Sequence, residues 1–443
     1  MQLKRFLHFV VPSPRLLAGS LLLAGLGGCS QAPDTAAPAP APASTEATAA
    51  TATQAAPDSD LKLQRVVMLM RHGVRPPTKP QVTPDGTHPK PWPKWSVDFG
   101  ELTPHGYDAV RLLGQWDRAN WASRGLLPAT GCPAKGEIEV AASSKSRTQD
   151  TARALVEGMA ADCGIKVTFP ASKKDDVEFH PLEAGAVAMD AHKARQAVEA
   201  RLPVGGMAAE VKAHAPLFAL LNQAMGCTPD TSCDISKMPA GLEHEDGDRP
   251  HVGAPFGIAS TASQTFLLEY LEGMPMKDVA WGNLTREQIG TLLQFHALKF
   301  QYQGRTPYIA VRAATPLAAR MLAAAEHGPR LTVLVGHDTN IADLGGMLDL
   351  HWQVPGYPRD DPPPAGAVGF EVLADPSGAQ FVRAFYRSQT MDQVRELQKL
   401  DATNAPSYEY LPIPGCAERC PLADFERIVS AKLVEPLRTP AAD

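Results

Sequence analysis

Residues 66–77 read VVMLMRHGVRPP: five apolar residues stop at an Arg-His-Gly triplet, and a second arginine and two prolines follow. An apolar run of this length, bounded by charge and by Gly and Pro, predicts a fully buried strand. Open α/β sheets form their ligand crevice at the carboxyl ends of such strands. Arg71 and Arg75 suit bidentate recognition of phosphate oxygens. His72 between them is a possible nucleophile for phosphorus, and Gly73 would let the backbone approach a ligand. For this motif alone, a strand that merely ends in a basic turn remains an open alternative.

A second stretch, LTVLVGHDTN at residues 331–340, has the same order of features. A buried strand ends in Gly, and polar residues then open the next helix. If both strands belong to one sheet, His72 meets the pair His337 and Asp338 at the same sheet edge.

A third stretch, IEVAA at residues 138–142, predicts another short strand that leads through Ser and Lys to Arg147. From the pattern alone, Arg147 is either a further phosphate ligand or an exposed arginine at a helix start.

These motifs together resemble the histidine acid phosphatases, branch 2 of the histidine phosphatase superfamily, and most closely their bacterial acid phosphatase/phytase members. The likeness rests on R-H-G-x-R-x-P far upstream of a strand ending in H-D. It extends from about residue 63 to 430. Further matching segments are Leu102-Thr103-Pro104, Ala161-Asp162-Cys163, Phe179-His180-Pro181-Leu182 and Gly336 through Gly346. The resemblance implies an α/β fold: a phosphoglycerate-mutase-like three-layer α/β/α core with an inserted, mainly helical cap.

The resemblance also assigns roles to residues. It makes His72 the nucleophile that forms a phosphohistidine, and Asp338 the proton donor to the leaving oxygen. The expected phosphate ligands are Arg71, Arg75, Thr78, Arg147 and His337. The expected substrate pocket adds Lys79, Thr261 and Gln264, of which the last two replace a Met and a Glu of the close phytases. No cofactor and no metal are expected, because the arginines neutralise the phosphate. His244 and His251 lie in an acidic loop whose spacing fits no standard metal-ligand pattern.

The implied function is an exported acid phosphatase that hydrolyses small phosphate monoesters, with phytate favoured as substrate. A glucose-1-phosphatase-like sugar-phosphate phosphatase remains the alternative. A phosphoryl mutase is disfavoured by the export signal and by the H-D acid. A non-catalytic surface lipoprotein would be expected to have lost part of the site.

Composition limits the class of protein. The chain has 443 residues, 44% hydrophobic and 20% charged, with a formal net charge of −6. These values are typical of a globular protein of one or two domains, and the acidic balance argues against a nucleic-acid partner. We expect a monomer that recruits its anionic substrate by local positive charge.

The first sixty residues predict an export address. Residues 1–29 have a basic start and a short apolar run, which is typical of a signal peptide. Their end resembles a lipoprotein cleavage box, so Cys29 is the expected lipidated residue and the only expected membrane attachment; cleavage without lipid is the alternative. Residues 30–60 are rich in Ala, Pro and Thr and predict an extended linker. The expected location is periplasmic or anchored to the outer membrane.

Six cysteines remain besides Cys29, an even number that suggests disulfides in an exported protein. Six cysteines allow 15 pairings, and spacing alone does not choose among them. The resemblance favours the pairs Cys132–Cys163, Cys227–Cys233 and Cys416–Cys420.

The expected domains are a catalytic α/β domain, residues 61–175 and 311–443, and a helical cap, residues 176–310. In the cap, residues 259–271 and 285–302 predict amphipathic helices. Thr285 begins the second with a capping-box pattern.

In the catalytic domain, Thr103 followed by Pro predicts a helix start. Thr315 and Pro316 predict another, leading into the strand at 331–335. Residues 368–373 and 380–385 predict an antiparallel edge pair joined by a Pro-Ser-Gly turn.

Overall fold

The computed structural model describes residues 60–88, 90–227, 233–243 and 249–435. The predicted signal peptide, Cys29, nearly all of the predicted linker, and His244 lie outside these residues. Residues 58–443 belong to one compact unit, so the division into a catalytic domain and a cap stays a prediction. No helix among the described residues is both long and apolar enough to cross a membrane.

The main sheet has eight strands in the order β10-β8-β7-β1-β6-β2-β3, with β9 paired to β8. Its strands in chain order are β1 (Lys62–Arg71), β2 (Ile138–Ala142), β3 (Val167–Thr168), β6 (Leu331–Gly336), β7 (Ala367–Ala374), β8 (Gln380–Ser388), β9 (Ser407–Leu411) and β10 (Cys420–Pro421). The strands β1, β6, β2 and β3 are mutually parallel, whereas β7, β8, β9 and β10 pair antiparallel. The buried strand predicted from residues 66–70 is β1, which lies at the junction of the two halves.

The helices before the cap region are α1 (Pro104–Ser123) and α2 (Ser146–Ala160). Those between residues 191 and 303 are α3 (Ala191–Glu199), α4 (Gly206–Ala213), α5 (Ala215–Ala224), α6 (Phe256–Leu271), α7 (Arg286–Leu292) and α8 (Gln294–Gln303). This stretch also contains the strands β4 (Leu242–Glu243) and β5 (His251–Val252) and the short 3-10 turns η1 (Ile235–Lys237) and η2 (Val279–Gly282). The remaining helices are α9 (Pro307–His327), α10 (Asp338–Leu348), α11 (Met391–Arg395) and α12 (Leu422–Ser430).

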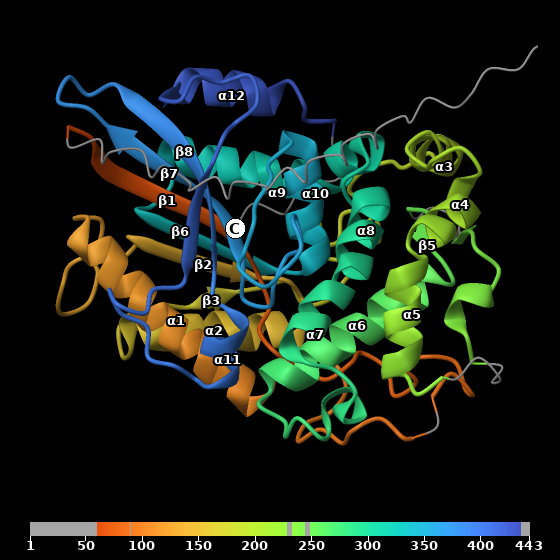
Figure 1. The fold of residues 1–443 in the computed structure, drawn as a ribbon. Coiled ribbons are helices and arrows are strands. Elements are labelled where there is room, and N and C mark those ends of the chain that lie inside the picture. Colours follow the sequence, from red (N-terminus) through yellow and green to blue (C-terminus); the bar gives the residue numbers. More distant parts are fainter. Residues whose placement is uncertain (1–59, 89, 228–232, 244–248, 436–443) are drawn as a thin grey trace, which may run out of the picture. The chain divides into compact units, whose positions relative to one another are not determined.

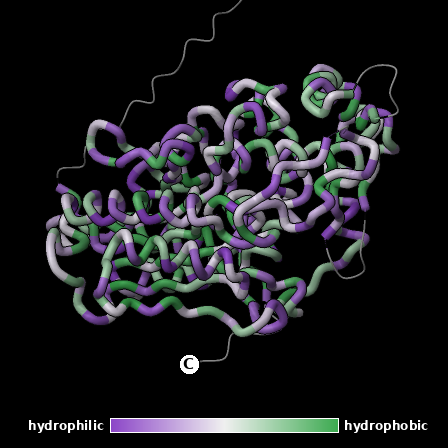
Figure 2. The backbone as a smooth tube through the Cα atoms, turned by 90° about the horizontal axis from the view of Figure 1, so that it is seen from below, coloured by the Kyte–Doolittle hydropathy of each residue, from purple (hydrophilic) through white to green (hydrophobic). Residues whose placement is uncertain are grey.

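The side chains of β1 explain the layers. Val66, Met68 and Met70 enter a hydrophobic cluster that includes residues of α1 and α2. Val67 and Leu69 point the other way, into a cluster that includes residues of α9 and α10. Because successive residues of a strand face opposite sides, an apolar run without alternation places β1 between two helical layers. Figure 1 shows α1 and α2 on one side of the sheet and α9 and α10 on the other. In Figure 2, hydrophobic segments of the chain run through the interior of the fold.

Several predicted elements are confirmed. Thr103 caps α1, where its side chain accepts a hydrogen bond from the Gly106 amide. Thr285 begins α7 with a complete capping box. The strands β7 and β8 form the predicted antiparallel pair. All three disulfides implied by the resemblance are present.

Other predictions were wrong in detail. The helix predicted over 285–302 is two helices, α7 and α8, separated at Leu293. The pair β7–β8 is not at an edge, because β7 adjoins β1 and β8 adjoins both β9 and β10. The domain division stays a prediction, and residues 310 and 311 at its second boundary both lie in α9.

Thr315 and Pro316 do not start a helix. They lie in the middle of α9, which begins after Thr306 with Pro307 in its first turn. The proline removes one backbone donor, at a typical cost of about 3 kcal/mol or more. The Thr315 hydroxyl donates to the Val311 carbonyl at 2.6 Å, and buried residues on both sides of the proline hold the helix together.

Candidate active site

Three neighbouring parallel strands end at the site. In the register of β1, β6 and β2, Arg71 lies opposite Gly336 and Ala142 lies opposite Val335. The next residues along each strand are therefore His72, His337 and Ser143. The His72 amide donates to the Gly336 carbonyl at 3.0 Å. The prediction that His72 and the pair His337–Asp338 meet at one sheet edge is confirmed.

Gly73 serves helix packing, and its expected role in ligand approach stays a prediction. A Cβ atom at this position would lie 3.0 Å from Leu102 and 3.1 Å from Val110. Leu102 precedes α1 and Val110 lies within it, so the absent side chain lets α1 pack directly against the end of β1. The geometry of the R-H-G turn thus depends on this helix.

The partners of His72 define its reactive atom. Its Nδ1 lies 2.9 Å from the Gly73 carbonyl oxygen, which only accepts, so Nδ1 carries the proton. The Nε2 lone pair faces the site, where it accepts a long hydrogen bond from the Arg75 Nε at 3.4 Å. Burial, together with Arg147, Arg75 and Arg71, holds the pKa of His72 well below its ordinary value. His72 is therefore a neutral imidazole with an available nitrogen.

The three predicted arginines surround this nitrogen but differ in their partners. Arg71 pairs with Asp338 at 2.9 Å and donates to the Pro362 carbonyl at 2.6 Å. In the described part of the chain, neither Arg75 nor Arg147 forms an ion pair with a carboxylate. Burial and the neighbouring Arg147 and Arg71 lower the pKa of Arg75 to about 9. Uncompensated positive charge at this density favours a bound anion.

His337 is held from two sides. The Ser143 hydroxyl donates to Asp176 at 2.8 Å, so the Ser143 oxygen accepts from His337 Nε2 at 3.2 Å. The His337 Nδ1 then accepts from Arg147 at 3.4 Å. Burial and the adjacent Arg147 hold the pKa of His337 well below its ordinary value. The imidazole is neutral, and its Nδ1 becomes a donor to a phosphate oxygen only after gaining a proton.

Asp338 is the first residue of α10, where the helix dipole favours negative charge. Its Oδ2 lies 2.9 Å from Arg71 and 3.6 Å from the Nε2 of His296. Burial alone would raise the pKa of Asp338, but Arg71 and the contact with His296 hold it well below the ordinary value. The predicted proton donor is thus an ionised carboxylate in the ligand-free site.

The predicted pocket residues lie at different distances from this centre. Gln264 on α6 is buried and accepts from Arg71 at 3.0 Å, so it lies directly against the phosphate ligands. Thr261, one turn earlier on α6, is exposed, and its hydroxyl donates to the Gly257 carbonyl at 2.9 Å. A Cβ atom at Gly100 would contact both Thr78 and Arg147, which places Thr78 beside this arginine. Lys79 is exposed next to it, and no contact to the site is seen.

Sequence reasoning missed several residues that adjoin the site. Ser143 and Asp176 orient His337, and the His180 ring lies 5.1 Å from the His337 ring between centroids. The motif Phe179-His180-Pro181-Leu182 was the only sequence signal for His180. His296, which adjoins Asp338, and Asp361, which contacts His296, belong to no motif, so no local pattern marks them.

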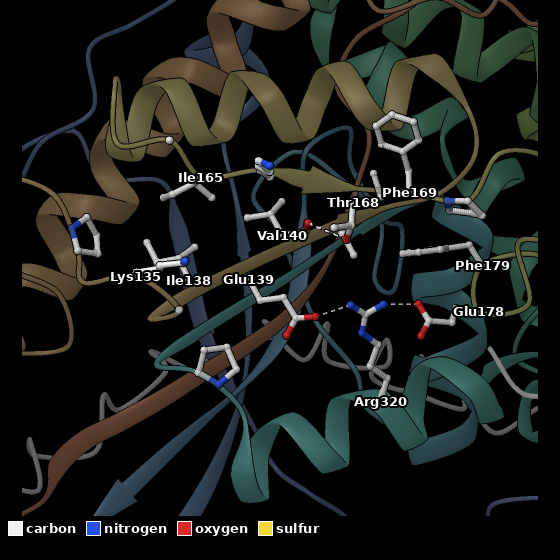
Figure 3. Close-up of a pocket in the computed structure, with 18 of the residues that line it drawn as sticks. Lys135, Ile138, Glu139, Val140, Ile165, Thr168, Phe169, Glu178, Phe179 and Arg320 are labelled. Carbon is white, nitrogen blue, oxygen red and sulfur yellow. Dashed lines mark hydrogen bonds and ion pairs between the residues drawn. The ribbon is translucent and has the colours of Figure 1, made fainter. Parts of the chain in front are cut away.

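A separate pocket of about 1060 Å³ lies along β2 and β3. In Figure 3, Arg320 reaches across it between Glu139 and Glu178, with its guanidinium 2.6 Å from Glu139. The arginine is thereby neutralised by two carboxylates, and neither His72 nor Arg75 lines this pocket. It is not the site at which a phosphate group would be bound.

At the strand ends of this mixed β-sheet, a neutral imidazole, three guanidinium groups and a carboxylate lie together. This arrangement is that of an enzyme of phosphoryl transfer. Comparison with known proteins gives the family. A model described as histidine phosphatase superfamily (branch 2) matches residues 62–202. Phytase AppA of Escherichia coli K12 is 34% identical over 410 residues, which cover 85% of this chain and 93% of the relative. The protein belongs to the histidine acid phosphatase family, whose members hydrolyse phosphate monoesters.

Other relatives agree with this assignment. A glucose-1-phosphatase of Salmonella typhimurium is 28% identical, covering 83% of this chain and 92% of the relative. The solved structure of Hafnia alvei phytase in complex with tartrate superposes with a TM-score of 0.80 at 34% identity, covering 85% of this chain and 98% of that one. The same phytase with myo-inositol hexakis sulphate gives a TM-score of 0.79 at 33% identity, with the same coverage. The predicted fold class is confirmed.

Proposed function

We propose that the protein is an exported phytase that cleaves phosphate monoesters in two steps through a phosphohistidine at His72. The observation that carries the proposal is the unprotonated Nε2 of His72, enclosed by Arg71, Arg75 and Arg147. Neutral imidazole is the nucleophilic form, and the arginines compensate the charge of the equatorial phosphate oxygens. Asp338, beside the same guanidinium groups, is the proton donor to the leaving oxygen.

In the first step the Nε2–phosphorus bond forms as the bond from phosphorus to the ester oxygen breaks, and that oxygen takes a proton from Asp338. In the second step water attacks phosphorus, gives a proton to Asp338 and releases His72. A phosphate dianion close to Asp338 opposes the effect of Arg71 and favours the protonated acid. The site thus acquires its acid form as the substrate binds.

The phytate assignment is supported by charge and by relatives. Arg75 and Arg147 have no carboxylate partner in the described chain, so the site favours a substrate with several negative groups. Both a phytase of Escherichia coli and that of Hafnia alvei resemble this chain at 34% identity. The predicted cap is part of the proposal, since α6 and α8 supply Gln264 and His296 to the site.

A sugar-phosphate phosphatase is the second candidate, favoured by the glucose-1-phosphatase relative and by the neutral Gln264 over Arg71. Phosphate release from phytate and from glucose 1-phosphate, measured in parallel at mildly acidic pH with a chelator present, distinguishes the two. We expect faster release from phytate, and His72→Ala should abolish release from both. Preference for glucose 1-phosphate would be consistent with the proposed mechanism but would contradict phytate as the substrate. Activity of the His72→Ala protein would show that His72 is not the nucleophile.

A further inference from the structure

The side chain of His296 lies between two carboxylates behind the predicted acid. Its Nδ1 is 2.5 Å from Oδ1 of Asp361, and its Nε2 is 3.6 Å from Oδ2 of Asp338. His296 lies in the first turn of α8, whereas Asp361 belongs to the segment between α10 and β7. Asp361 is fully buried and His296 nearly so, at 0% and 4% exposure, so water does not replace these contacts.

The other groups around this chain of contacts also fix it in place. The Phe300 ring packs edge-on against His296, with ring centroids 4.7 Å apart. Arg71 holds the same Asp338 oxygen from β1, and Arg71 is itself anchored on the Pro362 carbonyl, next to Asp361. Lys299 on α8 and the His72 ring also interact electrostatically with Asp338. The imidazole therefore cannot turn away from either carboxylate without breaking buried contacts.

Counting protons shows what this arrangement does. An imidazole nitrogen and a carboxylate oxygen attract each other only when a proton lies between them. Both contacts of His296 are filled when the three groups together carry two protons. One of these protons then lies on His296 Nε2 and faces the ionised Asp338 Oδ2 across the 3.6 Å ion-pair contact. A buried carboxylate beside the imidazole stabilises its protonated form.

This geometry supplies a proton source that the proposed mechanism, on which the inference rests, needs. Arg71 keeps Asp338 ionised in the ligand-free site, so the proton that Asp338 holds once the substrate is bound must come from a neighbouring group. We propose that His296, held by Asp361, is the positioning and proton-reservoir residue for Asp338. As the substrate binds, the N–H bond at His296 Nε2 breaks and an O–H bond forms at Asp338. When the leaving oxygen departs, it takes this proton from Asp338, and the neutral His296 keeps its other proton on Nδ1. When water attacks the phosphohistidine, the water proton returns through Asp338 to His296.

Two variants of the reservoir test the proposal. In Asp361→Asn the shape is kept but the charge that stabilises the imidazolium is lost, and His296→Gln removes the titrating ring. We expect kcat for an alkyl phosphate such as glycerol 2-phosphate to fall about tenfold or more in each. With p-nitrophenyl phosphate, whose leaving group needs no proton, we expect less than about a threefold loss. In Asp361→Asn the buried negative charge beside the imidazole is absent, so the alkaline limb of kcat for the alkyl ester should move to lower pH.

The matched control is Asp360→Asn, the same chemical change one residue earlier. Asp360 pairs with His351 at 2.7 Å and with Arg305 at 3.7 Å and has no contact with His296. This variant should retain the wild-type kcat on both esters and the wild-type pH profile. Thermal unfolding of all variants shows whether they fold.

Equal losses on the alkyl and aryl esters, with an unmoved alkaline limb in Asp361→Asn, would reduce the pair to a structural role and overturn the proposal. The same follows if Asp361→Asn behaves like Asp360→Asn. A wild-type protein without activity on any of these esters would instead overturn the proposed function itself, so the two failures are distinguishable.

Discussion

At the level of single residues, the site combines a neutral imidazole with an ionised acid. Burial, followed by the charges of Arg147, Arg75 and Arg71, lowers the pKa of His72. Burial opposes the ionised form of Asp338, but Arg71 and His296 favour it. The arginines proposed to bind the phosphate thus also influence the protonation of the two residues proposed to react with it.

Substitution of Asp338 by Asn tests its role as the acid. The amide keeps the shape but has no proton to give, so hydrolysis of an alkyl phosphate should fall about 10²- to 10⁴-fold. An aryl ester such as p-nitrophenyl phosphate should lose less than about tenfold, because its leaving group needs no proton. Steady-state kcat values for both esters give the comparison. Equal losses would show that Asp338 acts in binding and not as the acid.

The pH dependence follows from His72. An ordinary imidazole with a pKa of about 6.5 is about 97% protonated at pH 5 and would be inactive there. Since the pKa of His72 is lowered, its reactive neutral form persists as the pH falls through this range. We expect kcat/KM, corrected for ionisation of the substrate, to show no acidic limb between pH 6.5 and 5. An acidic limb near pH 6.5 would mean that His72 titrates as an exposed histidine does.

At the level of elements, α1 and α2 pack beside the R-H-G turn on one side of the sheet. Glycines in both helices let their backbones come into close contact. A Cβ atom at Gly158 would lie 2.0 Å from the Arg111 carbonyl oxygen, and one at Gly114 would lie 2.4 Å from the Leu155 carbonyl oxygen. Both neighbours are helix backbone, which cannot move aside by a change of rotamer. The helix spacing therefore depends on these two glycines.

Gly158→Ala tests this packing. Helix propensity alone predicts a stabilisation of about 1 kcal/mol, whereas the clash predicts a loss of about 1–3 kcal/mol. We expect the clash to dominate and the free energy of unfolding, measured with urea, to fall. Gly241→Ala is the control, because a Cβ atom there meets nothing within 4 Å. An unchanged or increased stability of Gly158→Ala would show that the helices separate at little cost.

At the level of the whole molecule, the predicted export address and the disulfides are consistent with each other. The three disulfides lie in separate regions of the compact unit and close loops of different length. Such bonds persist in oxidising compartments and are rare in the cytosol. The lipid anchor at Cys29 and the linker of residues 30–60 stay predictions from the sequence.

The anchor is tested by Cys29→Ala. Without the thiol no lipid is attached, so the protein should move from the membrane fraction to the soluble fraction, with its kcat unchanged. Fractionation of cells followed by activity assays of both fractions measures this. Unchanged partitioning would exclude attachment through Cys29.

The amino-acid sequence by itself determined where the main reactive groups lie. Arg71 ends an apolar strand, and His72, His337 and Asp338 follow apolar strands directly, so local periodicity places them at strand ends, and parallel pairing then brings the strand ends together. Arg147 lies a few residues further on, in the first turn of the helix after β2. The same local signals indicated the starts of α1 and α7, because capping involves residues three positions apart. The family resemblance added the disulfide pairs, which spacing alone left open.

Only the tertiary structure decided how these groups are tuned. His296 and Asp361 are 65 residues apart and lie on elements with no shared sequence pattern, yet they meet behind Asp338. The proton position on His72 depends on one carbonyl oxygen, and the continuation of α9 through Pro316 depends on burial against other helices. Such contacts arise when separate elements pack against each other. Local periodicity records which face of an element is buried but not which side chain it will meet.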